Sequence, residues 1–196
     1  CATASVRGAK AEIWVATQAP AAAREAVASA LGFSASDVIL YPMMAGGAFG
    51  RALDPAVAVE AALISRQMGR PVQLTWSRAE ECLQDHYRAP AKARMIGAID
   101  GAGQLAGFAA KIAAPATMRE QLRRMVRGDL PYQAWQEAAD ERDPLAVEGA
   151  MPPYAIPNIA IDHYPANVGI PTGRWRGNAD SYTAFFVESF LDELAR

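Results

Sequence analysis

Cysteine and histidine are scarce in this sequence, which has two of each among its 196 residues. Cys1 and Cys82 form no CxxC pair, so neither a disulfide framework nor a zinc-ribbon spacing is present. Cys82 and His86 stand four residues apart, which would place two ligands on one helix face, but no second pair completes a metal site. We expect a packed thiol and a helix-end histidine here, and no metal held directly by protein side chains.

Long apolar runs and net positive charge are also missing. No stretch approaches the roughly 20 apolar residues that span a bilayer, and no signal-peptide pattern opens the chain. The formal net charge is −2, so nothing attracts the chain as a whole to nucleic acid or to an anionic membrane. We expect a soluble chain with no nucleic-acid partner and no direct membrane insertion. Its compartment, cytoplasmic or periplasmic, stays open.

Several familiar catalytic signatures are absent. There is no GxSxG, and two histidines offer little for a serine or cysteine hydrolase. The segment AGGAFGR at residues 45–51 follows an apolar run but lacks the GK[ST] ending of a P-loop. GAGQLAG at residues 101–107 lies between two expected strands, whereas a dinucleotide fingerprint needs a helix after it, so this segment indicates a hairpin turn. Hydrolysis and nucleoside triphosphate chemistry are therefore disfavoured.

The sequence does contain enough apolar residues, 52% of the chain, to bury a core. Its first half alternates β-prone runs with Ala-rich segments of helical spacing, and Gly32 and Gly69 mark the helix ends. Asp54 and Pro55 supply an N-cap and a first-turn proline for the second helix. This rhythm predicts an α/β unit with some parallel pairing. The expected strands are residues 11–18, 36–44 and 71–77, and the expected helices are residues 21–33 and 56–69.

The second half predicts a short helix near residues 77–85 and then a β-hairpin around DGAG at residues 100–103. Residues 116–150 are polar and helical in pattern, as expected for an insertion or a lid. A proline-interrupted strand region and an amphipathic C-terminal helix, residues 178–196, complete the chain. We therefore expect a mixed α/β (α+β) fold, with one domain over residues 1–196. The missing N-terminal methionine and the helix running to Arg196 suggest a piece of a longer polypeptide.

Three short segments are candidates for ligand contact. The glycine-rich turn at residues 45–51 is either a ligand cradle or an ordinary turn. TGRWRG at residues 172–177 is either a solvated loop with a docked tryptophan or a guanidinium fork for an anionic or carbonyl-bearing ligand. ATQAP, which contains Gln18, is either a turn that leads into a helix or an amide aimed into a cleft.

Taken in order, WVATQAP, AGGAFGR, ISRQMGRPVQLTWSRAEE and TGRWRGNADSYTAFFVESFLDEL resemble a known family. It is the molybdenum-binding subunit of the xanthine dehydrogenase and aldehyde oxidase family, and most closely its bacterial branch of isoquinoline 1-oxidoreductase beta subunits. The resemblance covers nearly the whole chain apart from residues 116–150. It implies a fragment of a molybdopterin-binding domain, whose parent is an oxidoreductase, a molybdenum hydroxylase that oxidises aldehydes or N-heteroaromatic compounds. It also implies molybdopterin cytosine dinucleotide as cofactor and a partner subunit that carries [2Fe–2S] clusters.

The resemblance also implies roles for individual residues. Gln18 would donate a hydrogen bond to an oxo ligand of the molybdenum, and Arg176 would orient the substrate and stabilise negative charge. Phe49 would shape the substrate pocket, and Arg51 would support the loop or the cofactor's phosphates. An anionic cofactor of this bulk suits Cβ-free backbone and converging N–H groups. The loop that would bring these N–H groups to the pterin consists of Gly46, Gly47, Ala48, Phe49 and Gly50.

The sequence departs from the family pattern at several positions. The family loop is commonly GGGFGRR, and this chain has Ala48 and Ala52 at two of those positions. A methyl group at position 48 requires a negative φ there. Residues 177–180 also differ from the usual run, and the glutamate that serves the family as a base has no counterpart here, so we expect no turnover from these residues alone. Two alternatives stay open: a non-catalytic scaffold that has lost the cofactor, and an α/β domain that binds another anion.

Overall fold

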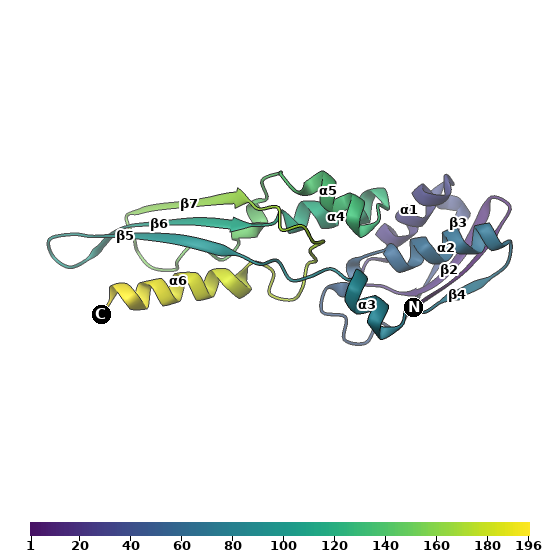
Figure 1. The fold of residues 1–196 in the computed structure, drawn as a ribbon, viewed down its shortest axis with the longest axis horizontal. Helices are drawn as coiled ribbons and strands as arrows, with labels where there is room; N and C mark the ends of the chain where they lie inside the picture. Colours follow the sequence, from purple (N-terminus) through teal and green to yellow (C-terminus); the bar gives the residue numbers. More distant parts are fainter.

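The computed structural model describes residues 1–196 and divides the strands between two separate sheets. Figure 1 shows an elongated molecule with one sheet towards each end and two helices, α4 and α5, near the middle. The N-terminus lies in the first lobe, and the C-terminus lies beside the sheet of the second. None of the helices is long and apolar enough to cross a membrane.

The first sheet has the strand order β3-β2-β1-β4, with β1 Ala2–Arg7, β2 Lys10–Ala16, β3 Val38–Met43 and β4 Val72–Leu74. β2 and β3 are parallel, and β1 is antiparallel to both β2 and β4. Side chains alternate between the faces of a strand, so β2 directs Ala11, Ile13 and Val15 to the buried face.

Two helices, α1 Pro20–Leu31 and α2 Ala56–Met68, cover that buried face. α1 ends at Gly32 and α2 at Gly69, both left-handed, as the sequence indicates. Small side chains let α2 lie close to β1, and Ser65 of α2 accepts a hydrogen bond of 3.0 Å from the Val6 N–H. The resulting core contains 15 buried residues.

The second sheet has the order β5-β6-β7, with β5 Lys92–Ile99, β6 Leu105–Ala114 and β7 Asn158–Pro165. β5 and β6 form the predicted antiparallel hairpin, and β6 and β7 are parallel. Helix α6 Asp180–Leu194 packs on β5, where Gly97 leaves room for Leu194: a Cβ at Gly97 would lie 2.6 Å from the Leu194 Cδ1. A smaller core of seven buried residues lies beneath this sheet.

The remaining elements are short 3₁₀ helices and the helices that lie between the two sheets. The 3₁₀ helix η2 Arg51–Leu53 precedes α2, and helix α3 Arg78–Gln84 follows β4. Residues 116–150 contain α4 Thr117–Arg127, α5 Pro131–Ala138 and the 3₁₀ helix η3 Pro144–Val147, and α4 packs against α1 (Figure 1). A further 3₁₀ helix, η1 Ala35–Asp37, precedes β3. The division of the chain into one domain with a lid stays a prediction.

The mixed α/β class, the hairpin and the C-terminal helix are confirmed. β1 was not expected from the sequence, and it lies between β2 and β4, so the three expected strands are not adjacent in the sheet. The prediction of Asp54 as the N-cap of α2 is wrong, because Pro55 occupies that position. The Asp54 carboxylate still accepts a 3.0 Å hydrogen bond from the Ala56 N–H.

Candidate functional site

The three candidate segments of the sequence meet in space. The Gly50 N–H donates to the Gln18 Oε1 at 3.2 Å, which joins the glycine loop to the turn after β2. The Arg176 N–H donates to the Phe49 carbonyl at 2.9 Å, which joins the same loop to the segment before α6. Residues far apart in the chain therefore form one surface at the end of the parallel pair β2 and β3.

Gln18 is held by backbone and side-chain bonds. Its N–H donates to the Ala52 carbonyl at 2.8 Å, and the Thr17 hydroxyl donates to the same carbonyl at 3.1 Å. Because the Oε1 of Gln18 accepts from Gly50, the amide orientation is set, and the side-chain NH₂ donates to no group of the protein. The side chain is exposed, so these two N–H donors are available to a ligand.

The loop that follows β3 presents unpaired backbone donors. None of the N–H groups from residue 46 to residue 49 donates to an acceptor in the protein. Gly46 has φ 59° and Phe49 has φ 50°, whereas Ala48 lies outside the left-handed region, so its methyl group is accommodated. Successive free N–H groups in such a turn suit an anion.

Gly50 allows the loop to contact a second backbone segment directly. Its φ is 97°, and a Cβ there would lie 2.2 Å from the Arg174 carbonyl oxygen. Only glycine permits both this conformation and this approach. The loop and residues 173–176 therefore pack backbone against backbone.

The charged and aromatic candidates have distinct surroundings. Arg51 forms an ion pair with Asp85 just after α3, which supports the loop from outside. Arg176 is exposed, and its carbonyl accepts from the Arg88 guanidinium at 3.0 Å. Neither Arg88 nor Arg176 has a carboxylate partner. The Phe49 side chain is 58% exposed, so it is free to contact a ligand.

A buried charge network lies directly behind this surface, and the sequence analysis missed it. The Arg124 guanidinium forms an ion pair with Asp54, donates to the Glu120 Oε1 at 2.7 Å and donates to the Thr172 carbonyl at 3.0 Å. Glu120 accepts the Thr172 N–H and the Thr172 hydroxyl, both at 2.8 Å. The four side chains are at most 4% exposed. We call this set, Asp54, Glu120, Arg124 and Thr172, the buried network.

Burial and charge shift the titration of groups in this region. Burial alone would raise the pKa of Asp54, but the Arg124 guanidinium, together with His86 and the Ala56 N–H, holds it below the ordinary value. His86 lies beside Asp54, with 3.6 Å between its Nε2 and the Asp54 Oδ2. Burial, reinforced by Arg124, lowers the pKa of His86 to about 3. His86 is therefore neutral at neutral pH, and its Nε2 has no hydrogen-bond partner.

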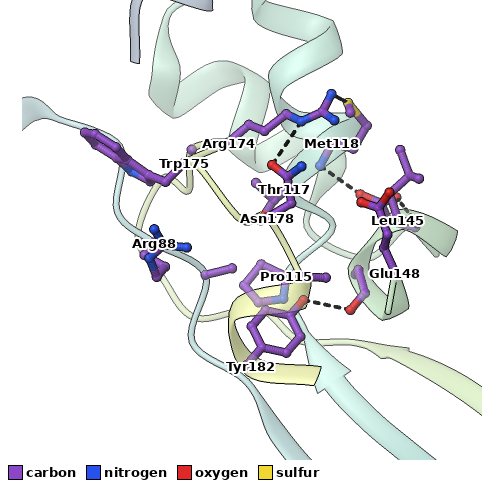
Figure 2. Close-up of a pocket in the computed structure, with 15 residues that line it drawn as sticks. Arg88, Pro115, Thr117, Met118, Leu145, Glu148, Arg174, Trp175, Asn178 and Tyr182 are labelled. Atoms are coloured by element: carbon purple, nitrogen blue, oxygen red, sulfur yellow. Dashed lines mark hydrogen bonds between the residues drawn. The ribbon is translucent and has the colours of Figure 1, made fainter. Parts of the chain in front are cut away.

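A small cavity of about 40 Å³ lies on the other side of residues 173–179 (Figure 2). The Arg174 Nε donates to the Asn178 Oδ1 at 3.0 Å, and the Tyr182 hydroxyl donates to the Ala146 carbonyl at 2.7 Å. The cavity lies directly behind the Arg176 segment.

The expectation for Cys82 and His86 was half right. His86 is buried at the end of α3, but the Cys82 thiol is exposed. The spacing of four residues does not place both on one face, because α3 ends at Gln84 and the chain turns before His86.

Comparisons with known proteins identify the family of this chain. A family model described as "Molybdopterin cofactor-binding domain" matches residues 1–130. The chain is 27% identical to the beta subunit of isoquinoline 1-oxidoreductase from Brevundimonas diminuta, over 95% of this chain and 23% of that protein. It is 24% identical to a subunit of nicotinate dehydrogenase from Pseudomonas putida, over 100% of this chain and 16% of that protein.

Solved structures share the fold. Quinoline 2-oxidoreductase from Pseudomonas putida 86 matches with a TM-score of 0.72 at 22% identity, over 100% of this chain and 24% of that one. The aldehyde oxidoreductase from Desulfovibrio desulfuricans ATCC 27774 matches with a TM-score of 0.73 at 19% identity, over 99% and 20% respectively. The chain thus spans less than a quarter of the length of these relatives. The family match over residues 1–130 shows that this chain belongs to the molybdopterin cofactor-binding domain family, the cofactor-binding part of molybdenum hydroxylases of the xanthine dehydrogenase type.

Proposed function

We propose that this chain forms part of the cofactor-binding subunit of a molybdenum hydroxylase that oxidises N-heteroaromatic compounds or aldehydes. One observation carries the proposal: the amide of Gln18, the free N–H groups of the glycine loop and the Arg176 segment form one surface of hydrogen-bond donors. Donors gathered in this way suit an anionic cofactor.

The residues present fit the cofactor. The side-chain NH₂ of Gln18 and the backbone N–H groups of residues 46–49 have no acceptor in the protein. Ala48 does not strain the backbone, and Ala52 holds Gln18 through its carbonyl, so an alanine side chain there removes no contact of the loop. The Gln18 amide and the loop N–H groups are therefore available to a cofactor with Ala48 and Ala52 in place.

Each part of the site has a distinct task. When bound, the cofactor supplies the two-electron redox chemistry that side chains lack. The loop from Gly46 to Gly50 would hold its anionic pterin end through backbone N–H groups, and Gln18 would hold the cofactor through its free side-chain NH₂. Phe49 provides an apolar wall, and Arg176 orients the substrate and stabilises negative charge that develops on it. Arg51, paired with Asp85, acts on the cofactor only by supporting the loop.

The proposed substrate classes are those in the names of the relatives. Isoquinoline, nicotinate and quinoline are N-heteroaromatic compounds, and another relative is an aldehyde oxidoreductase. The cofactor is the cytosine dinucleotide form, and electrons leave through an iron–sulfur subunit. Since the chain spans a small share of each relative, turnover requires residues beyond these 196.

Elemental analysis of the full-length protein, purified from its own source after growth with molybdate, tests the proposal. We expect close to one molybdenum per polypeptide and release of cytidine monophosphate on acid hydrolysis. Protein that retains molybdenum should then oxidise isoquinoline, nicotinate or an aldehyde with an artificial electron acceptor. A folded protein without molybdenum would overturn the cofactor role and favour the scaffold.

A further inference from the structure

Arg124 of α4 binds the Asp54 carboxylate on one side and the Thr172 carbonyl on the other, and so joins the two segments that lead to the donor surface. We propose that Arg124 is a positioning residue, which sets the spacing between the glycine loop and the Thr172–Arg176 segment. Insofar as this spacing serves the cofactor, the inference rests on the proposed function. The spacing itself is a property of the chain and can be measured without cofactor.

On one side, Arg124 holds the end of the glycine loop through Asp54. Asp54 directly follows η2, and its N–H donates to the Arg51 carbonyl at 3.3 Å. Its Oδ1 accepts the Ala56 N–H, which leaves Oδ2 for the Arg124 Nε. The carboxylate therefore joins the loop, the first turn of α2 and α4 at one point.

On the other side, Arg124 holds the start of the Arg176 segment through Thr172. The Thr172 carbonyl accepts from the Arg124 Nη2, and its N–H and hydroxyl donate to Glu120. Two residues later the Arg174 carbonyl lies against Gly50. Both segments that meet at the donor surface are thus fixed behind it to the same guanidinium.

The geometry requires arginine. Three nitrogens of the Arg124 guanidinium serve three acceptors, on Asp54, Glu120 and Thr172. A lysine ammonium is a single charged point on a flexible stem and cannot reproduce this planar fork. The Arg124 side chain is 1% exposed, so its loss would leave the buried Asp54 carboxylate without its cationic partner.

The neighbouring residue on α4 provides a matched control. Arg123 pairs with Glu137 and Glu141, and its side chain is 29% exposed. Exposed ion pairs contribute little to stability, and these connect α4 only to residues of α5 and the turn after it. Arg123→Gln therefore removes an arginine from the same helix without touching the buried network.

Loss of Arg124 would disturb the donor surface, because two of its hydrogen bonds cross between the two segments that Arg124 holds. The Gln18–Gly50 and Phe49–Arg176 hydrogen bonds both depend on the position of the loop relative to residues 172–176. A change of about 1 Å in the placement of binding groups can cost roughly a hundredfold in rate. Arg124 acts on the reaction only through this placement and touches neither substrate nor cofactor.

Hydrogen–deuterium exchange on the full-length protein tests the inference directly. In Arg124→Lys we expect the hydrogen-bonded amides of residues 50–53 and 172–178 to exchange at least tenfold faster together, while peptides of β1 and β2 keep their protection. Molybdenum content should fall several-fold, and the Mo(V) electron paramagnetic resonance spectrum of the retained fraction should change. Arg123→Gln should match the wild type in all three measurements.

Thr172→Val covers the case in which Arg124→Lys does not fold. It removes only the hydroxyl bonds to Glu120 and Thr117, and should loosen the same two peptides to a smaller extent. If either folded variant exchanges like the wild type, or if only one of the two segments loosens, the positioning role is overturned. If both loosen but the wild type holds no molybdenum, the cofactor function fails while the positioning role stands.

Discussion

At the scale of single residues, Gly50 is the most tightly constrained position of the candidate site. Its φ of 97° is left-handed, and an added Cβ would lie 2.2 Å from the Arg174 carbonyl oxygen. Gly46 in the same loop has φ 59°, but nothing lies within 4 Å of an added Cβ. A substitution at Gly46 therefore introduces only left-handed backbone strain, whereas a substitution at Gly50 adds a steric clash.

Gly50→Ala should lower the free energy of unfolding by about 3 kcal/mol, because left-handed strain and a backbone clash add. Gly46→Ala should cost only about 1 kcal/mol, the strain alone. Urea denaturation of both variants measures the difference. Equal losses would show that the loop moves away from Arg174 freely, contrary to the close packing in the structure.

His86 makes stability depend on pH. Its pKa is near 6.5 in an unfolded chain and about 3 in the folded protein, so below pH 6.5 the unfolded state binds the extra proton. Its contribution to stability is complete above pH 6.5 and is lost as the pH falls towards 3. Between pH 7 and pH 5 the loss is about 2 kcal/mol.

His86→Gln should remove this dependence. We expect the difference in unfolding free energy between wild type and variant to shrink by about 2 kcal/mol on going from pH 7 to pH 5. Denaturant unfolding at the two pH values measures it, and His163 is present in both proteins, so its contribution cancels. A difference that does not change with pH would mean that His86 binds a proton as readily in the folded protein as in the unfolded chain.

At the scale of elements, the sequence predicts what local patterns determine. Glycines 32 and 69 end their helices and the DGAG turn joins its strands, because left-handed φ and turn geometry depend on neighbouring residues. β1 has the sequence ATASVR, whose small residues carry little strand propensity. It becomes a strand because β2 and β4 pair with it on both sides, which no local pattern shows.

The same distinction separates the predictable and unpredictable parts of the site. The converging segments with Gln18, Phe49 and Arg176 were found through their order along the chain, and the roles assigned to them stay predictions. Arg123 and Arg124 are adjacent in a run of polar residues, and only tertiary packing exposes one and buries the other. The sequence therefore contained no signal that distinguished the positioning arginine from its neighbour.

At the scale of the whole molecule, the two lobes have separate cores. The 15 buried residues of the first lobe and the seven of the second share no member. Between them lie α4 (Figure 1) and the buried network, which is held by ion pairs and hydrogen bonds and not by apolar contacts. Segments with few shared apolar contacts open independently of one another.

Val59 and Val187 test this division as a matched pair, since each is 2% exposed and each belongs to a different core. Substitution by alanine should cost about 2 kcal/mol in either lobe. In hydrogen–deuterium exchange of the full-length protein, Val187→Ala should speed exchange in β6 and α6 and leave β1 and α2 protected, while Val59→Ala should do the reverse. Equal loss of protection in both lobes would show that the two lobes unfold together as a single cooperative unit.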